Sequence, residues 1–172
     1  MDIKIINQSI NHLIKDKKIK NLIDNYSQPK FINNNNYFDA LSKSIIYQQL
    51  SGKVAKIIYT RFLSLFNNNG SNPHQYLSFN NSDLRLIGLS KQKISYIENL
   101  SNYFINKHQS IDLATLSNEE VINELITIKG IGRWTIDMFL MFTLFRTDIL
   151  PVGDLGIKKA FKQLYNLKDL PS

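Results

Sequence analysis

Apolar residues along this chain recur at intervals of three and four positions and almost never alternate with polar residues. Intervals of three and four place residues on one face of an α-helix, whereas alternation is the pattern of a half-buried β-strand. Two such patterns open the chain, at Ile6, Ile10, Leu13 and Ile14 and then at Ile19, Leu22 and Ile23. The sequence therefore predicts an all-α fold that begins with two amphipathic helices.

The same periodicity predicts further helices after a polar tract at residues 33–36, which we interpret as a solvated loop. The predicted helices cover residues 38–46, 54–65, 74–79, 82–87, 91–106 and 133–145, and another begins after Ser117. Ser51 is a predicted N-cap, and Ser117 with Glu120 forms the S-x-x-E pattern of a capping box. Residues 67–73, "NNNGSNP", are predicted to form a loop, and Gly88 a turn.

The charge of the chain favours a polyanionic partner. Lys and Arg number 21 against 14 Asp and Glu, a formal net charge of +7, and 43% of the 172 residues are hydrophobic. This composition is that of a folded protein with its own core, and the positive charge suits nucleic acid. A proteome that is basic throughout is the alternative explanation of the charge.

Several classes of site are excluded or disfavoured. The chain has no cysteine, which excludes disulfides, thiolate metal sites and Cys-bound iron–sulfur clusters. His12, His74 and His108 are far apart and form no metal-binding motif, so we expect them at the surface. The N-terminus lacks a signal-peptide pattern, and no run approaches the roughly 18 apolar residues of a membrane span. From these missing signals we expect a cytoplasmic, nucleoid-associated or nuclear protein.

The stretch "ITIKGIGRWTIDMF", residues 126–139, places Gly130 and Gly132 between two apolar runs. Glycine permits positive φ and close backbone approach, so we predict a helix, a tight hairpin and a second helix. The unpaired N–H groups and the dipole at the start of the second helix can hold a DNA phosphate, which a Cβ would keep away. A G-x-G pattern alone is a weak signal, and a simple αα-hairpin is the alternative.

Asp154 stands in "ILPVGDLGIKKAF", twenty residues after Trp134 and ahead of a Lys-rich helix. An Asp at such a position is ordinarily an N-cap. A carboxylate at a helix N-terminus beside a phosphate-binding hairpin is also well placed to oppose positive charge developing on a deoxyribose. Asp154 is therefore a candidate for N-glycosidic bond cleavage. Lys158 and Lys159 either steer phosphates or form a solvated helix face.

Together these motifs resemble the helix-hairpin-helix DNA glycosylases that carry a Gly/Pro-rich loop and a downstream Asp, most closely the 3-methyladenine DNA glycosylase II branch. The resemblance runs from about Phe38 to the end of the chain. Four ordered motifs carry it: "ALSKSIIYQQLSGKVAKIIYTRF", "LIGLSKQKISYIENLS", "LITIKGIGRWTIDMFLMF" and "LPVGDLGIKKAF". It implies an all-α fold of two helical lobes with a DNA-facing cleft, and a damaged nucleotide flipped out of the duplex.

The resemblance implies a role for each matching residue. Asp154 falls on the catalytic Asp, whose proposed roles are to stabilise an oxocarbenium-like sugar and to assist attack by water. Trp134 and Met138 fall on walls of the base pocket, where an electron-rich Trp face suits a cationic alkylated base. Core packing is the alternative for Met138. In relatives that also cut the strand, a Lys at the Trp134 position forms a Schiff base with the sugar, so Trp134 predicts a monofunctional glycosylase that leaves an abasic site.

The DNA contacts implied by the resemblance fall on separate segments of the chain. "YQQLS" matches the segment that supplies a wedge for the gap left by the flipped base, which indicates Gln49 and Leu50. The predicted DNA-binding residues are Gln49, Leu50, Ser51, Gly88, Lys91, Lys93, Lys129, Gly130, Gly132 and Arg133. An ordinary helix end is the alternative for "YQQLS", and surface solvation is the alternative for the lysines after Gly88.

The resemblance also implies a structural cation but no cofactor for catalysis. The family hairpin binds a monovalent cation, Na+ or K+, through backbone carbonyls. In this sequence the matching carbonyls are those of Ile126, Ile128 and Ile131.

We expect one glycosylase domain in three parts: residues 1–36 with the N-terminal helices and Asn-rich loop, 37–128 as a helical lobe, and 129–172 with the hairpin, catalytic loop and C-terminal helix. Some members add an N-terminal mixed α/β domain, and we expect a minimal form without it. Members usually continue after the Asp-bearing helix with another helix, whereas this sequence stops at "NLKDLPS". We therefore expect either a truncated lobe or one completed by something else.

The predicted function is base excision repair by a monomer that acts on double-stranded DNA containing damaged bases, of the 3-methyladenine and 7-methylguanine type. A noncatalytic hairpin DNA-binding protein, which would not need Asp154, is the second hypothesis. A helical protein-interaction module is the third. Within the enzyme hypothesis, excision of mismatched uracil or thymine and of oxidised purines are rivals, because pocket shape sets base choice.

Overall fold

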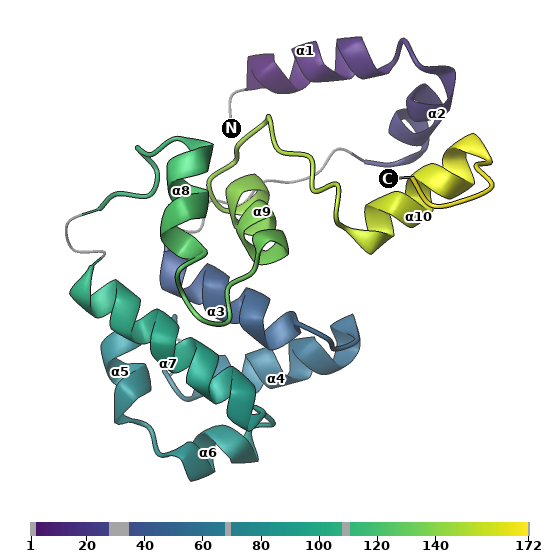
Figure 1. Ribbon diagram of the computed structural model, residues 1–172. Helices are drawn as coiled ribbons and strands as arrows, with labels where there is room; N and C mark the ends of the chain where they lie inside the picture. The colour runs from purple at the N-terminus through teal and green to yellow at the C-terminus, as the bar shows by residue number, and fades with distance from the viewer. Residues whose placement is uncertain (1–2, 28–34, 68–69, 108–110, 172) are drawn as a thin grey trace. The chain divides into compact units, whose positions relative to one another are not determined.

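The chain is a succession of helices. The structure is a computed structural model that describes residues 3–27, 35–67, 70–107 and 111–171. Its helices are α1 (Ile3–Leu13), α2 (Lys17–Asn25), α3 (Tyr37–Tyr47), α4 (Gly52–Ser64), α5 (Pro73–Ser78), α6 (Asn81–Leu86), α7 (Lys91–Asn106), α8 (Asn118–Leu125), α9 (Arg133–Phe142) and α10 (Leu155–Tyr165) (Figure 1). These ranges contain no strand, which confirms the all-α prediction. None of the helices described is long and apolar enough to cross a membrane.

Two of the predicted helix starts carry the capping side chains that the sequence indicates. The Ser51 hydroxyl accepts the Val54 N–H at the start of α4. At α8, Ser117 and Glu120 form both halves of the predicted capping box, and these bonds from Ser117 lower the pKa of Glu120. Asn36, predicted to lie in the Asn-rich loop, instead accepts the Asp39 N–H as the N-cap of α3. Of that tract, residues 33 and 34 lie outside the described residues.

The predicted end of α9 was wrong by three residues. The helix ends at Phe142, not at Phe145, because the Leu144 N–H turns back to the carbonyl of Phe139. Phe145 then has a left-handed backbone with φ 55°, and the Arg146 N–H bonds to the Leu140 carbonyl. An apolar run alone does not show where the backbone changes direction. Of the three histidines, His12 and His74 are exposed as predicted, and His108 lies outside the described residues.

The chain forms two compact units. We call Asn34–Arg146 the core unit, and Met1–Asn33 together with Thr147–Ser172 the terminal unit. The helix-hairpin-helix segment falls in the core unit, whereas Asp154 falls in the terminal unit.

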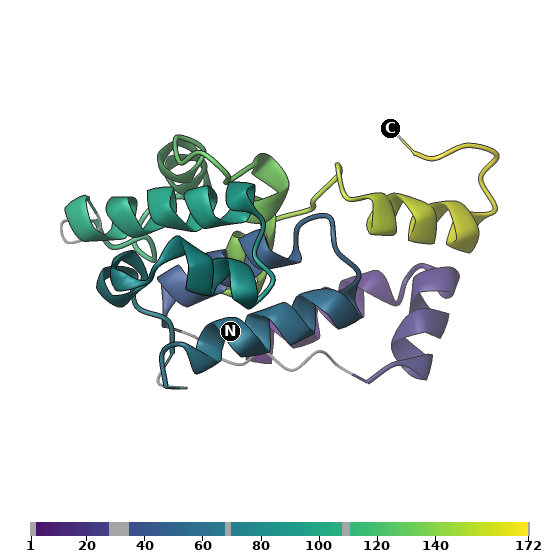
Figure 2. The same cartoon turned by 90° about the horizontal axis from the view of Figure 1, so that it is seen from below.

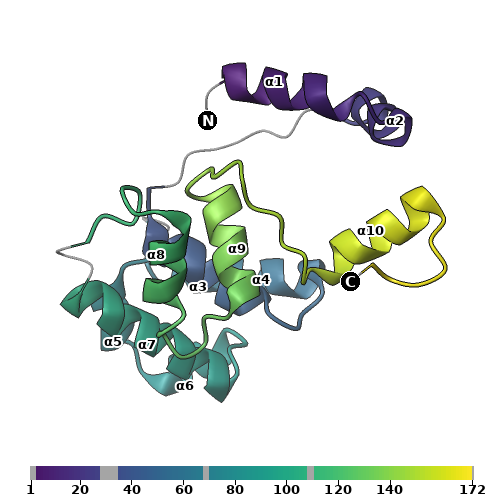
Figure 3. The ribbon, with the colours of Figure 1, turned by 45° about the horizontal axis from the view of Figure 1, so that its top comes forward.

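The core unit is built around α7. This helix packs against α5 and α3, while α3 also packs against α4 and α9 (Figures 1 and 3). Its large, fully buried side chains include Leu41, Ile45, Phe62, Phe66, Ile97, Leu100 and Phe139. Burying each such side chain contributes about 1.5–3 kcal/mol, so this packing fixes the relative places of the helices. The buried Asp39 also links parts of the core unit, because its carboxylate accepts hydrogen bonds from the hydroxyls of Tyr59 at 2.6 Å and Ser71 at 2.8 Å.

The terminal unit is held differently. Helix α2 lies beside α10 (Figures 1 and 2), and neither helix has a buried residue. The Tyr165 hydroxyl donates to Asp16 at 2.8 Å, and the Lys18 ammonium donates to the Leu164 carbonyl at 2.8 Å. The Lys18 ammonium also lies 5.1 Å from the centre of the Tyr165 ring. Polar contacts at helix ends therefore join the N-terminal segment to the helix that follows Asp154.

Candidate DNA-binding and catalytic site

The predicted hairpin is present between α8 and α9, which lie side by side (Figures 1 and 3). After α8 the Ile128 N–H bonds to the Leu125 carbonyl at 3.1 Å, and the Ile131 N–H bonds to the Ile128 carbonyl at 2.9 Å. The side chains of Ile128 and Ile131 are buried. Two apolar anchors therefore hold the turn, while its glycines form the tip.

Glycine suits the two hairpin positions for different physical reasons. Gly130 has φ 106°, and a Cβ built on it would lie 2.3 Å from Cγ of Tyr96 on α7. Gly132 has φ −104° and is the N-cap of α9, and a Cβ there would meet nothing within 4 Å. Only Gly130 therefore uses the positive φ that both glycines permit. Gly132 leaves open space in front of the first turn of α9, where a phosphate could approach.

The start of α9 suits an anion. Gly132 provides no side-chain cap, so the first N–H groups of this helix have no capping side chain. The helix dipole adds partial positive charge at the same end. Arg133 is 64% exposed and donates from Nε to Oδ1 of the buried Asp137 at 2.8 Å, which orients its guanidinium. Lys129 is exposed on the other side of the glycines.

The predicted wedge lies between α3 and α4. In this wedge segment, which we define as residues 48–51, Gln49 and Leu50 are exposed and Ser51 caps α4. Gln49 has φ 57°, a left-handed backbone that is uncommon for a residue with a side chain. The sequence indicated this segment but gave no sign of its strained backbone.

The lysines at the start of α7 separate into two kinds. Lys91 is exposed, in keeping with the predicted phosphate contact. The Lys93 ammonium instead donates to the carbonyls of Ile46 at 2.7 Å and Gln48 at 2.8 Å, and burial lowers its pKa. Lys93 is thus engaged within the core unit, at the end of α3. The turn before it is tight, since Gly88 has φ 104° and a Cβ there would lie 3.2 Å from Ile58.

The two predicted pocket residues share one face of α9. Trp134 and Met138 are four positions apart, one helical turn. Trp134 is 42% exposed, although large aromatic side chains are usually well buried, and Met138 is half-buried. The exposed indole gives α9 an aromatic surface two residues after its N-cap, Gly132.

Asp154 is the N-cap of α10. Its Oδ1 accepts the Ile157 N–H at 2.8 Å, and its own N–H donates to the Pro151 carbonyl at 2.9 Å. A Cβ built on Gly156 would lie 3.0 Å from the same Oδ1. The loop before Asp154 therefore holds this residue, and the absence of a Cβ at Gly156 leaves room for its carboxylate. The N-cap alternative is confirmed as geometry, and it is compatible with a second, catalytic role.

The hairpin offers backbone carbonyls, the type of ligand that a monovalent cation takes. Backbone carbonyl oxygens are the donors that K+ and Na+ use in other proteins. The Ile128 carbonyl accepts the Ile131 N–H with one of its two lone pairs, and the second lone pair can bind a cation. Within the described part of the chain no cluster of three His, Cys, Asp or Glu residues could hold a metal, so a cation here would depend on the carbonyls of Ile126, Ile128 and Ile131.

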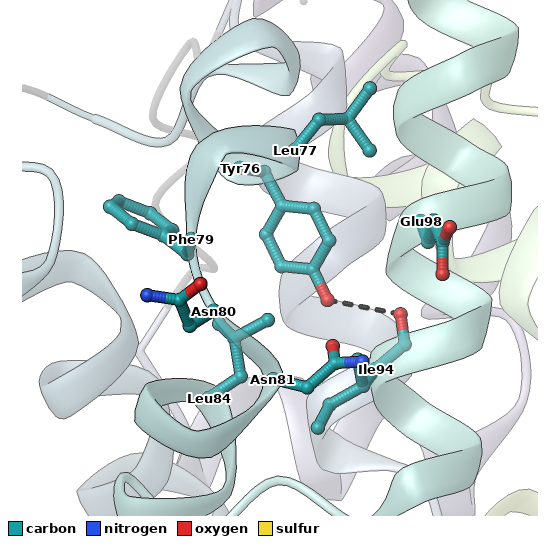
Figure 4. Close-up of a pocket in the computed structure, with 8 residues that line it drawn as sticks. All are labelled: Tyr76, Leu77, Phe79, Asn80, Asn81, Leu84, Ile94 and Glu98. Atoms are coloured by element: carbon teal, nitrogen blue, oxygen red, sulfur yellow. Dashed lines mark hydrogen bonds between the residues drawn. The ribbon is translucent and has the colours of Figure 1, made fainter.

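A cavity elsewhere in the core unit does not contain the predicted residues. It has a volume of about 310 Å³ and lies among α5, α6 and α7 (Figure 4). The Tyr76 hydroxyl on its wall already donates to the Ile94 carbonyl at 3.0 Å. Its lining is Tyr76, Leu77, Phe79, Asn80, Asn81, Leu84, Ile94 and Glu98. The candidate DNA-binding site of the core unit is the hairpin, the wedge segment and the exposed face of α9, and the Asp154 loop is the candidate catalytic element of the terminal unit.

Helix, hairpin and uncapped helix in this order define a helix-hairpin-helix protein. The model of the HhH-GPD superfamily of base excision DNA repair proteins matches residues 42–172, and the chain belongs to this family.

The chain is also similar to individual proteins of this family. DNA-3-methyladenine glycosylase 1 of Schizosaccharomyces pombe is 32% identical over 159 residues, which are 91% of this chain and 70% of that protein. The DNA-3-methyladenine glycosylase of Saccharomyces cerevisiae is 36% identical over 146 residues, 78% of this chain and 48% of that protein. The structure of the S. pombe 3-methyladenine DNA glycosylase Mag1 in complex with abasic DNA aligns with a TM-score of 0.84 at 31% identity, over 96% of this chain and 84% of that one.

Proposed function

We propose that this protein is a monofunctional DNA glycosylase that removes alkylated bases, of the 3-methyladenine and 7-methylguanine type, from double-stranded DNA. It hydrolyses the N-glycosidic bond of the flipped nucleotide, leaves an abasic site and acts as a monomer wherever the cell keeps its DNA. The observation that carries the proposal is Asp154, a carboxylate that caps α10 downstream of a phosphate-binding hairpin. The names of the relatives support the choice of substrate.

Binding rests on the core unit. The uncapped start of α9 and the exposed Arg133 hold phosphates of the damaged strand, with Lys91 and Lys129 adding charge. Gln49, with Leu50 beside it, enters the space left by the flipped nucleotide. The backbone carbonyls of Ile126, Ile128 and Ile131 would hold a monovalent cation, which would supply local positive charge at the hairpin.

The chemistry needs one carboxylate and one water molecule. An alkylated base already carries positive charge, so it leaves with the electron pair of the C1′–N bond as a neutral molecule. Positive charge then develops on the sugar, and the Asp154 carboxylate opposes it. Water forms the new C1′–O bond, and its proton passes to Asp154. Trp134 stacks on the cationic base, and because no amine occupies that position, no covalent bond to the sugar forms.

The test is base release from alkylated duplex DNA by the wild type and by Asp154→Asn. Asparagine keeps the N-cap oxygen that accepts the Ile157 N–H and removes only the charge. We expect Asp154→Asn to bind DNA as the wild type does, with base release slower by about 10²–10³-fold.

Alkali is added after the reaction to reveal abasic sites. Strand breaks that appear only after alkali, and only with the wild type, support a monofunctional glycosylase. Equal release by both proteins would remove Asp154 from the mechanism. Binding without release by either would favour a noncatalytic DNA-binding protein or another lesion.

A further inference from the structure

Gln48 links two segments that lie far apart in the sequence. Its Nε2 donates to the Gly130 carbonyl at 3.0 Å and to the Thr135 hydroxyl at 3.3 Å, across 82 and 87 positions of chain. Gly130 is the tip of the hairpin, and Thr135 lies in the first turn of α9. The side chain of the first wedge-segment residue is therefore attached directly to the phosphate-binding element.

The main chain of Gln48 is held as well. Its carbonyl and that of Ile46 both accept the Lys93 ammonium, which is partly buried at the end of α3. The next residue, Gln49, has the left-handed φ of 57°. A residue with a side chain adopts that backbone at a cost, and such strain persists where the surrounding structure fixes it. The contacts of Gln48 and Lys93 hold the residue before Gln49, and the Leu50 N–H bonds to the Tyr47 carbonyl across it at 3.3 Å.

We propose that Gln48 is a positioning residue, whose side-chain amide sets the distance between the wedge and the phosphate-binding hairpin. The inference rests on the proposed function, and it concerns how that function is executed. DNA is stiff, so a wedge at the wrong distance from a phosphate held by the hairpin fills the gap poorly. Gln48 itself need not touch DNA, because it acts through Gln49.

The first variant is Gln48→Met, which keeps the length of the side chain and removes its donor. The matched control is Asn99→Leu. Asn99 also donates a side-chain amide to the hairpin, to the Lys129 carbonyl at 3.5 Å, but the bond described for it does not reach the wedge segment. Comparison of the two separates a general loosening of the hairpin from loss of the link to the wedge.

Three quantities are measured for each protein: the single-turnover rate of base release, the dissociation constant for duplex DNA, and the fluorescence of 2-aminopurine placed opposite an abasic-site analogue. The last reports entry of the wedge without any chemistry. We expect Gln48→Met to release base about 10–100-fold more slowly and to lose most of the fluorescence change, since small misplacements have effects of this size. Its affinity for DNA, and all three quantities for Asn99→Leu, should stay within about threefold of the wild type.

The double variant Gln48→Met with Gln49→Ala tests the route of the effect. If Gln48 acts through the wedge, the double variant is no slower than Gln49→Ala alone. Multiplied effects, a wild-type rate for Gln48→Met, or an equal loss in Asn99→Leu would each overturn the inference. If the wild type itself releases no alkylated base, the proposed function fails, and the fluorescence change alone then decides: its loss in Gln48→Met supports the positioning role, and its retention overturns it.

Discussion

The core unit is stabilised internally by one kind of contact and the terminal unit by another. In the core unit, Phe62 and Phe139 belong to a set of large side chains that are fully buried. In the terminal unit, α2 and α10 contain no buried residue, and Asp16, Lys18 and Tyr165 join them by polar contacts. The hairpin and the wedge segment belong to the unit with the buried apolar core. Asp154 belongs to the unit whose helices are joined by polar contacts.

Under the proposed function, this difference separates the residues for DNA binding from the residue for the chemical step. A surface that must match the spacing of DNA phosphates requires fixed relative positions, which a close-packed core provides. A helix with few buried apolar contacts belongs to the part of a protein that opens most easily. Substitutions in the terminal unit should therefore change base release more than global stability, whereas truncation of a buried side chain in the core unit should lower both stability and DNA binding.

The largest expected effect is on the free energy of unfolding, which can be compared between one variant in each unit. Phe62→Ala removes a fully buried ring from the core unit and should lower the free energy of unfolding by about 3–5 kcal/mol. Phe161→Ala removes a ring that is 39% exposed on α10, stacked on Tyr165, and should cost less than about 1.5 kcal/mol. Urea unfolding followed by circular dichroism measures both. Equal losses would mean that the two units are equally packed.

The second prediction applies one substitution to both hairpin glycines. Gly130→Ser places a Cβ against the ring of Tyr96 at positive φ, so stability should fall by about 2–4 kcal/mol and DNA binding with it. Gly132→Ser has open space and a favourable N-cap residue, so stability should stay within about 0.5 kcal/mol.

The Gly132→Ser hydroxyl nevertheless takes the N–H groups that a phosphate would use. Its affinity for DNA should fall without loss of thermal stability, and the salt dependence of binding should become shallower. Thermal melting and fluorescence anisotropy at several salt concentrations measure both glycine variants. If Gly132→Ser binds as tightly as the wild type, the start of α9 is not the phosphate site.

Local signals predicted the fold well. The capping residues Ser51 and Ser117 lie where S-x-x-E and helix-start patterns placed them, because a cap is a contact between residues three positions apart. The helix predicted over about residues 91–106 matches α7, whose start is capped by Ser90, a cap that was not predicted from the sequence. The end of α9 was predicted wrongly, since the bond from Arg146 to Leu140 depends on how the chain leaves the helix.

The candidate site was predicted only in its parts. Nothing near Gln48 in the sequence shows that its partner is Gly130, and nothing near Lys93 shows that it serves α3 instead of solvent. Such contacts depend on which helices pack together, and the pattern of apolar residues does not give that pairing. The sequence does not indicate the close approach of Tyr96 to Gly130 for the same reason. The sequence could name chemistry-bearing residues, but not the bonds that hold them.

The third prediction concerns the terminal unit alone. Gly156→Ala puts a Cβ 3.0 Å from Oδ1 of Asp154, so the carboxylate must shift by a few tenths of an ångström. Base release should fall by about 3–10-fold. Stability should hold or rise by up to about 1 kcal/mol, since alanine favours helix over glycine. The control is Gly153→Ala, where a Cβ meets nothing within 4 Å. Single-turnover rates of base release and melting curves are measured for both variants. Equal rates in Gly156→Ala and Gly153→Ala would mean that Gly156 has no part in the position of Asp154.

The smallest expected effect is a local response of the terminal unit to acid. The hydrogen bond from Tyr165, followed by the Ile19 N–H, lowers the pKa of Asp16 below its ordinary value of 3.8. A lowered pKa in the folded state means that the contact contributes stability above pH 3.8, and that this contribution is lost as the pH falls through the lower folded value. We expect the NMR amide signals of Lys18 and Ile19 to shift in that range before the core unit unfolds.

The control for the acid response lies on the same helix. Asp16→Asn should abolish the shift of these signals, because no proton is taken up at that position. Asp24→Asn should leave it unchanged, because Asp24 pairs with Lys20 on the exposed side of α2 and does not contact Tyr165 in any bond described for it. An unchanged acid response in Asp16→Asn would show that another group controls how α2 meets α10. The polar contact would then not be what holds the helix that follows Asp154.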